Sequence, residues 1–278
     1  MGPPLVFAFA SIPPRVEANV GSLVEVMTKH QTRPPDVILL SYPKTFRRFA
    51  GIHEAPSVPG LTVHRPVSDE GPATKWLGAL EYIAGTPELK NALLIIGDDD
   101  IDYKEDFLEL MERRLLADAT KVYAGYIEPD EIGPFNVRVA QGCSGIGMAA
   151  PVAAPLLQVA RFEDCFRTDD VWVSDAFQKL GVEVVNVVPS INGYAATRHI
   201  DDAGDYQEWL TQSKRSDAGG LFYEPEAGSI ANEACANAAA RERGLPGQHQ
   251  VRECLCWIIV MALLALAVWV ALRRWRGR

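Results

Sequence analysis

The feature that most constrains the fold is a regular alternation of apolar runs with amphipathic segments through the first part of the chain. Four apolar runs are typical of buried strands, at residues 5–11, 35–43, 60–66 and 90–100. The segments that follow three of them carry apolar residues at helical spacing, at residues 16–30, 73–85 and 103–118. Strands that alternate with helices predict an α/β fold with a mixed, mostly parallel sheet and helices on both faces. Such sheets bind ligands at the carboxyl ends of their strands.

The later part of the chain is more mixed and changes composition near residue 214. Residues 121–127, 137–150 and 182–190 are typical of strands, the second of them with a glycine loop, and residues 169–181 are typical of a helix. Beyond this point the chain becomes rich in Ala, Gly and Glu. We therefore predict three parts: an α/β catalytic domain at 1–213, a helical extension and linker at 214–250, and a membrane anchor with a basic tail at 251–278.

The anchor prediction depends on the segment "LCWIIVMALLALAVWVAL", residues 255–272, which contains no charged residue and is followed by "RRWRGR". Its length suits a single membrane-spanning helix, with tryptophans near both ends. A buried core helix is the alternative. The basic tail favours a cytosolic C-terminus, whereas the N-terminus lacks the features of an export signal. We expect a single-pass C-terminal anchor with the body of the protein in the cytosol.

Net charge and cysteine content argue against a nucleic-acid-binding protein and against a disulfide-rich or zinc-binding protein. The net charge is −9 in spite of the basic C-terminus, which argues against nucleic acid as a partner. A bound phosphate is then expected to meet a metal ion, a few placed cations and backbone N–H groups. The five cysteines are odd in number and irregular in spacing, so they predict neither a disulfide framework nor a zinc site, and they favour a reducing compartment.

The stretch "LLIIGDDDIDYKEDFLE" places a dense acidic cluster directly after a predicted strand. Counted from Asp98, its carboxylates match the ligand positions of a calcium loop, but Tyr103 stands where that loop needs glycine, and a strand precedes it instead of a helix. A second interpretation is a metal-binding pair, because Asp98 and Asp100 would point the same way on an extended segment. A solvated acidic turn before a helix is the third.

Five blocks, taken together, resemble a known family: "SIPPR", "PDVILLSYP", "DEGPATKWLGAL", "IIGDDDIDY" and "FRTDDVWVSDAF". Over residues 5–210 they look like the GT-A fold (Rossmann-like), nucleotide-sugar-dependent glycosyltransferases of the family 2-like branch. The resemblance implies a metal-dependent, inverting hexosyltransferase that moves a sugar from a UDP- or GDP-linked donor to a hydroxyl of a glycan, lipid or protein acceptor. A membrane tether is compatible with such an acceptor.

The resemblance also implies roles for individual residues. The residues matching the donor-binding positions are Ser11, Ile12, Pro13, Arg15, Asp69, Lys75, Asp98 and Asp99. The residues matching the metal positions, for Mn²⁺ or Mg²⁺, are Asp98, Asp100 and His199. Asp170 matches the catalytic base. The residues expected on the acceptor or sugar side are Gly142, Ser144, Gly145 and Asp169. A cation beside the leaving diphosphate would stabilise its developing charge, and a separate carboxylate would activate the acceptor hydroxyl.

Several of these residues have a plain structural alternative. Asp169 or Asp170 could cap the helix that follows, Lys75 could be a solvated helix lysine, and His199 could be an ordinary loop histidine. The glycine loop at 142–148 could be a strand bulge. We expect the two tryptophans at predicted helix starts, Trp76 and Trp172, to be packing residues.

Two other functions stay open. One is a non-catalytic GT-A-like domain that binds a nucleotide or metal without turnover. The other is a nucleotidyltransferase, which shares a nucleotide-binding α/β sheet and metal-binding carboxylates. That class would want a basic, glycine-rich signature after the first strand, and "SIPPRVEAN" contains no glycine before Gly21.

Overall fold

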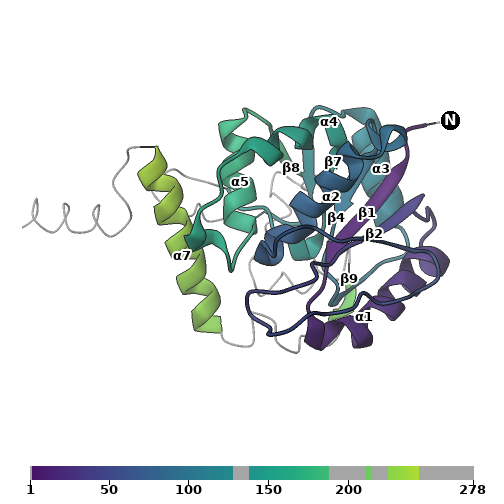
Figure 1. The fold of residues 1–278 in the computed structure, drawn as a ribbon. Helices are drawn as coiled ribbons and strands as arrows, with labels where there is room; N and C mark the ends of the chain where they lie inside the picture. The colour runs from purple at the N-terminus through teal and green to yellow at the C-terminus, as the bar shows by residue number, and fades with distance from the viewer. Residues whose placement is uncertain (1, 128–137, 188–210, 215–224, 244–278) are drawn as a thin grey trace, which may run out of the picture.

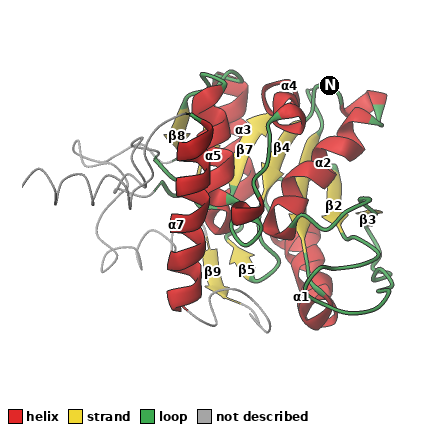
Figure 2. Cartoon of the chain, turned by 60° about the vertical axis from the view of Figure 1, so that its left-hand side comes forward, coloured by secondary structure: helices red, strands yellow, loops and turns green. Residues whose placement is uncertain are grey.

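A computed structural model describes residues 2–127, 138–187, 211–214 and 225–243 of the chain. Within these residues the main sheet has seven strands in the order β3-β2-β1-β4-β7-β6-β8 (Figures 1 and 2). The strands are β1 (Leu5–Ala10), β2 (Val37–Ser41), β3 (Leu61–His64), β4 (Leu93–Ile96), β6 (Val122–Ala124), β7 (Ile146–Ala149) and β8 (Val184–Asn186). Strand β7 alone runs antiparallel to its neighbours in this sheet. The predicted mixed, mostly parallel sheet is confirmed.

Helices cover both faces of the sheet, as the alternation of elements predicted. The period-two geometry of β1 sends Val6 and Ala8 into one core and Phe7 and Phe9 into the other. The first core packs against α2 (Thr74–Ala84) and α5 (Asp170–Lys179). The second packs against α1 (Pro13–Glu25), its π-helical continuation η1 (Val26–His30), and α3 (Phe107–Ala117). Strand β1 is therefore buried on both sides, which explains its continuous apolar sequence.

Trp76 and Trp172 show how the helices fill the first core. They are 0% and 1% exposed. In α2, the buried residues Trp76, Ala79, Leu80 and Ile83 recur at helical spacing and face the sheet. The prediction that both tryptophans are packing residues is confirmed by their burial.

Shorter elements complete the described fold. They are η2 (Gly71–Ala73), η3 (Pro87–Leu89), η4 (Gly142–Ser144), α4 (Ala150–Ala153), η5 (Ala154–Gln158) and η6 (Glu163–Cys165). A second, two-stranded antiparallel sheet joins β5 (Ile101–Tyr103) to β9 (Thr211–Lys214), which lie side by side in Figure 2. Strand β5 was not expected, because the sequence placed the residues around Tyr103 at the start of a helix. Helix α3 begins instead at Phe107.

The order of the strands creates a switch point at β1. The chain builds β1, β2 and β3 in one direction across the sheet and then returns to add β4 on the other side of β1. All four strands are parallel, so the carboxyl ends of β1 and β4 open side by side at the same edge. In open α/β sheets this is the place where a crevice forms.

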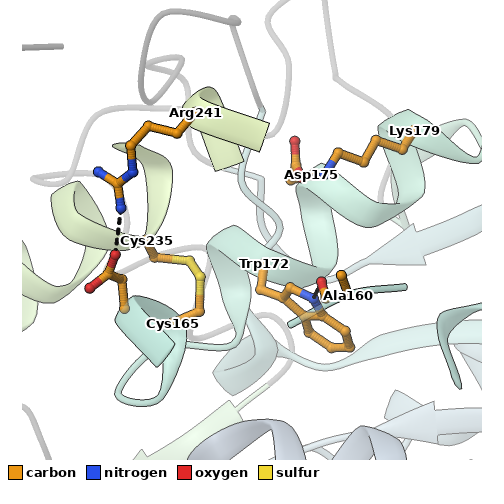
Figure 3. The surroundings of a disulfide bond; sticks show 8 residues. Ala160, Cys165, Trp172, Asp175, Lys179, Cys235 and Arg241 are labelled. Carbon is orange, nitrogen blue, oxygen red and sulfur yellow. Dashed lines mark hydrogen bonds and ion pairs between the residues drawn. A yellow bond between two sulfur atoms is a disulfide. The ribbon is translucent and has the colours of Figure 1, made fainter. Parts of the chain in front are cut away.

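A C-terminal helix, α7 (Pro225–Glu242), lies against α5 and η6 (Figure 1). A disulfide between Cys165 and Cys235 joins it to η6, and Figure 3 shows Arg241 of α7 reaching a carboxylate beside that bond. The expectation that the cysteines form no disulfide is therefore wrong for this pair. The two cysteines lie 70 residues apart, so their pairing follows from the docking of α7 and leaves no local spacing pattern.

The predicted membrane segment at residues 255–272 lies outside the described residues, as does the whole 251–278 part. In the portions of the chain that the structure describes, no helix combines the length and the apolar character needed to cross a membrane.

Candidate nucleotide site at the switch point

A pocket of about 290 Å³ lies at the switch point, where the carboxyl ends of β1 and β4 meet. Its walls come from the loops after β1, β2 and β4, the start of α2, the glycine loop at η4 and the segment that leads into α5. Asn232 of α7 also contributes to the lining. Segments far apart in the sequence therefore converge where the fold predicted a ligand to bind.

Arg15 holds one side of this pocket. Helix α1 begins with prolines at its first positions, so Arg15 falls in its first turn. Its guanidinium lies 2.8 Å from Asp99 Oδ1 and 3.2 Å from Asp100 Oδ2. Ser11, on the loop after β1, donates to Asp99 Oδ2 at 2.5 Å. The predicted donor-side residues Ser11, Ile12 and Arg15 all line the pocket.

Asp99 lies beneath the pocket surface and is only 1% exposed. Burial raises the pKa of Asp99 to about 6, because the charged carboxylate loses its hydration, while Arg15 and Ser11 act in the opposite direction. Asp99 therefore anchors Arg15 and Ser11 to the loop after β4. It was predicted to contact the donor, and the structure places both of its oxygens against this chain's own groups.

The segment from Asp98 to Asp100 forms a turn, not the extended strand end that the sequence suggested. The main-chain N–H of Asp98 donates to the hydroxyl of Tyr103 at 2.8 Å. As a result the two carboxylates have different partners: Asp98 Oδ1 accepts from the Lys75 ammonium at 2.6 Å, and Asp100 Oδ2 from Arg15. The turn at Asp99 and Asp100 interrupts the extended geometry behind the expectation that both side chains point the same way, and that expectation stays a prediction.

The predicted metal site stays a prediction. Asp98 and Asp100 are paired with cationic side chains. His199, the third predicted ligand, lies outside the described residues. Within the described ranges, no group of three or more His, Cys, Asp or Glu side chains gathers in an arrangement that could hold a metal ion.

Lys75 lies at the centre of the pocket's charged floor. Although it sits in the first turn of α2, it is 3% exposed, so the alternative of a solvated helix lysine is wrong. Its ammonium is 2.6 Å from Asp98 Oδ1 and 3.0 Å from Asp169 Oδ2. Burial alone would lower the pKa of Lys75, but the charges of Asp169, Asp98 and Asp170 outweigh it and raise that pKa well above its ordinary value. Lys75 is thus a permanent positive charge that lines the pocket.

Asp169 holds Lys75 in place. Its Oδ2 also accepts a hydrogen bond of 2.7 Å from the Trp76 indole, and the side chain is buried. It stands at the N-cap of α5 but makes no capping hydrogen bond. The capping alternative for Asp169 is therefore not what the structure shows. The residue lines the pocket on its Lys75 side.

Asp170 begins α5 and lines the pocket beside the glycine loop. Its Oδ1 accepts from the main-chain N–H of Gly142 at 2.9 Å. Burial and then the charge of Asp169 raise the pKa of Asp170 to about 8, although Lys75 and the Gly142 hydrogen bond lower it. Asp170 therefore holds its proton more tightly than an ordinary aspartate. Its predicted role as a base stays a prediction.

The glycine loop lies close to neighbouring side chains. A Cβ on Gly142 would lie 2.8 Å from Lys75 Nζ and 3.1 Å from Asp170 Oδ1. Gly145 has a φ of 84°, which favours glycine, and a Cβ there would meet the Phe107 ring at 2.4 Å. Ser144 is buried and donates to the Gln141 carbonyl at 2.9 Å, so it braces the turn. Gln141 and Cys143 are the residues of this loop whose side chains line the pocket.

Asp69 shapes the rim of the pocket. Its Oδ2 accepts from the main-chain N–H of Arg47 at 2.7 Å and its Oδ1 from that of Gly71 at 2.9 Å. Both contacts are to backbone groups, so Asp69 ties the loop after β2 to the segment before α2. It lies in the pocket lining, as the donor-side prediction requires, together with Lys75.

Sequence reasoning missed the loop after β2. That loop contributes Phe46, Arg48 and Phe49 to the pocket, and the segment before α5 contributes Phe166 and Arg167. The signal was visible as two Phe-Arg pairs, in "FRRF" and in "FRTDD". Neither pair has a periodicity or spacing that marks it as functional. The described cations that line the pocket are Arg15, Arg48, Lys75 and Arg167.

Comparisons with known proteins give little sequence-level information. No protein-family model matches the chain, and no curated protein matches it. Among solved structures, the chain is similar to a 4-diphosphocytidyl-2C-methyl-D-erythritol synthase, with a TM-score of 0.45 and 11% sequence identity. The match covers 75% of this chain and 99% of that chain.

The prediction of a glycosyltransferase is corrected at this point. No family model and no curated protein matches the chain, so these comparisons give that prediction no support. The hexosyltransferase class, the UDP- or GDP-linked sugar donor and the sugar acceptor predicted from the resemblance are therefore withdrawn. The neighbour's own substrate is not carried over, and the function is argued below from the pocket of this chain.

Proposed function

We propose that this protein binds a nucleotide in the pocket at the switch point and acts as a nucleotidyltransferase. The observation that carries the proposal is the buried Lys75 ammonium, which lies in the floor of that pocket between Asp98 and Asp169. The carboxylates hold this buried cation in a crevice at the ends of the strands. The cation is therefore in position to bind phosphate oxygens before a ligand arrives.

The pocket offers matching surfaces to both parts of a nucleotide. Lys75 and Arg15 supply positive charge for the phosphates, and the aromatic side chains Phe46, Phe49 and Phe166 supply apolar area for a base. The sequence argued against this class because "SIPPRVEAN", after β1, contains no glycine before Gly21. The cations of the pocket come from several segments of the chain, which supports the proposal without a single glycine-rich motif.

The chemistry required of the site is charge stabilisation. In nucleotidyl transfer an acceptor oxygen forms a bond to the α-phosphorus of a nucleoside triphosphate, the bond from that phosphorus to the bridging oxygen breaks, and pyrophosphate leaves with its electron pair. Negative charge grows on the phosphate oxygens during this step. Lys75 and Arg15 are held by their carboxylate partners before the ligand arrives, so they can stabilise that charge without reorganising.

A divalent cation, Mg²⁺ or Mn²⁺, is part of this proposal. Mg²⁺ is commonly bound by only one or two carboxylates together with substrate phosphates, so it needs no cluster of protein ligands. Asp98 and Asp100 line the pocket and are 28% and 15% exposed, which suits that limited role. When bound, the ion would neutralise charge on the phosphates. The GT-A designation of the fold, the membrane anchor and the cytosolic body stay predictions.

The test measures pyrophosphate release by the purified full-length protein. CTP, UTP, ATP and GTP are each supplied with Mg²⁺ or Mn²⁺ and with a panel of hydroxyl and phosphorylated acceptors, and nucleotide binding is measured in parallel. We expect one nucleotide to bind and to release pyrophosphate in an acceptor-dependent way.

Two lysine variants make the result specific. Lys75→Gln should lower nucleotide affinity or turnover by about tenfold or more, because it removes a charged phosphate contact. Lys90→Gln, an exposed lysine away from the pocket, should behave as the wild type. Binding without turnover would favour a non-catalytic nucleotide-binding protein. Neither binding nor pyrophosphate release with any nucleotide would refute the proposal.

A further inference from the structure

We propose that Asn232 of α7 determines which nucleotide the pocket accepts, by hydrogen bonding of its side-chain amide to the base. This role depends on the nucleotide binding proposed above. It adds to that function a residue from the C-terminal helix, which a disulfide joins to the wall of the pocket.

Asn232 lies on the face of α7 that packs against α5 and η6. Cys235, Ala236 and Ala239 follow it by three, four and seven residues, which is the spacing of one helix face. These three residues are 0%, 4% and 2% exposed. Asn232 itself is half-buried. It is therefore a polar side chain on a buried, alanine-rich face.

Packing alone gives no reason for an amide at this position. Asparagine is a weaker helix former than alanine, and its amide loses hydration when the face is buried. Alanine occupies most of the neighbouring positions on this face. At Asn232, however, the face reaches the pocket, where the amide can hydrogen bond to a ligand.

The disulfide determines which side of the pocket Asn232 reaches. Cys235 lies about one helical turn after Asn232, and its Cα is 4.5 Å from that of Cys165, to which it is bonded (Figure 3). Phe166, the residue after Cys165, lines the pocket. Asn232 therefore reaches the pocket on the side formed by Phe166.

The same side of the pocket carries apolar area for a base. The guanidinium of Arg47 lies 3.8 Å from the centre of the Phe166 ring. Arg47 lies in the chain between Phe46 and Phe49, whose ring centroids are 6.2 Å apart. Arg47 thus joins Phe166 to the loop that carries the other two rings. A base packed against these rings would present its polar edge to Asn232.

An amide suits the recognition of a base edge. It offers a donor N–H and an acceptor C=O side by side. Cytosine and uracil differ by the exchange of a donor for an acceptor on that edge, and so do adenine and guanine. An amide held in one orientation therefore distinguishes the two members of each pair.

The experiment uses the full-length protein under non-reducing conditions and measures binding by isothermal titration calorimetry. The ligands are CTP, UTP, ATP, GTP and inorganic triphosphate, which has no base. We compare the wild type with Asn232→Ala, with Asn232→Asp, and with the matched control Asn237→Ala, an asparagine of α7 outside the pocket lining. Thermal melting confirms that each variant is folded.

Asn232→Ala should weaken binding of the preferred nucleotide about tenfold and reduce the preference within its pair, because it removes hydrogen bonds to the base. Asn232→Asp keeps the size of the side chain but replaces the amide donor by an acceptor, so it should change that preference. Inorganic triphosphate should bind to Asn232→Ala as it does to the wild type. Asn237→Ala should bind every ligand as the wild type does.

Two results would overturn the specificity role. One is wild-type affinity and wild-type base preference in both Asn232 variants. The other is an equal loss of affinity for nucleotide and for inorganic triphosphate in Asn232→Ala, which would place Asn232 at the phosphates or in the support of the pocket.

Further outcomes separate this role from the proposed function. Pyrophosphate release with a base preference that does not depend on Asn232 would refute the specificity role and leave nucleotidyl transfer standing. A preference that depends on Asn232, in a protein that releases no pyrophosphate, would leave the specificity role standing and refute the transfer. Binding of none of the four nucleotides would refute both.

Discussion

Asp170 shows how the surroundings of a single residue change the meaning of a sequence motif. "TDD" before a helix suggested either a base or a cap, and the structure shows a carboxyl packed against Gly142 and next to Asp169. Helix capping is a local property that sequence can predict. The pKa of about 8 depends on burial and on charges from other segments, and no local pattern records those.

Replacing Asp170 by Asn should make the protein more stable in mildly alkaline solution. The folded protein binds this proton more tightly than the unfolded chain, whose Asp has a pKa near 3.8. The contribution of Asp170 to stability is therefore complete below about pH 4 and is lost progressively as the pH rises towards 8. We expect Asp170→Asn to gain about 1 kcal/mol or more at pH 8, or about 2–4 °C in melting temperature.

Melting curves of both proteins between pH 4 and pH 9 check this expectation. The difference in melting temperature should grow with pH, and a constant difference would contradict the raised pKa. Asp164→Asn, on the exposed surface, provides a control for the loss of one acidic group.

At the scale of the elements, sequence periodicity predicted the strands and helices of the main sheet. Strands β1, β2, β3 and β4 and helices α2, α3 and α5 lie within the predicted segments, whereas α1 begins at Pro13, before its predicted segment. These elements are long or strongly apolar, so their local pattern reflects their burial. The pattern failed around Asp98, where a hydrogen bond from its main-chain N–H to Tyr103 supports a turn, and at β5, which pairs with a segment more than a hundred residues away.

Helix α7 depends on contacts that the sequence does not show. The predicted boundary at residue 214 reflects a real change in composition, yet α7 packs against α5 and sends Asn232 to the pocket. Cys165 and Cys235 are fully buried beside each other. The pocket residues Phe166 to Asp170 directly follow the disulfide, so the same bond anchors that wall.

The double variant Cys165→Ser/Cys235→Ser should be less stable by about 2–4 kcal/mol, because it removes a cross-link that closes a loop of 70 residues. Melting under non-reducing conditions measures this loss. Reduction of the wild type should lower its melting temperature to a similar extent. Cys143→Ser, which removes a described cysteine outside the disulfide, should show no comparable loss.

At the scale of the whole molecule, sheet topology predicted the position of the pocket better than any motif predicted its chemistry. The strand order reverses at β1, and this reversal determines where the crevice forms. The order of the strands itself follows from the packing of their apolar faces. The charged lining of the crevice includes Lys75, Arg48 and Arg167, which come from separate segments. Their convergence depends on the tertiary fold. The sequence could therefore predict Lys75 as a candidate residue, but it could not predict that the arginines line the same crevice.

Because the pocket joins several segments, the cognate nucleotide should stabilise the whole described fold. At a nucleotide concentration of 100 times its Kd, mass action predicts about 2.7 kcal/mol of added stability. Thermal melting against increasing nucleotide measures this effect. The shift should be much smaller in Lys75→Gln at the same concentrations and unchanged in Lys90→Gln. An equal shift in all three proteins would show that the nucleotide binds elsewhere.

The bond between Cys165 and Cys235 also bears on the predicted membrane orientation. Disulfides persist in oxidising compartments and are rare in the cytosol, where thiols are kept reduced. A lasting bond and the predicted cytosolic body therefore exclude each other in a cell with a reducing cytosol. Protein extracted from its native cells with thiols blocked would reveal the redox state of this pair. An intact disulfide would place the body on the opposite side and leave the arginine-rich end in the cytosol, which is the orientation that the positive-inside rule favours.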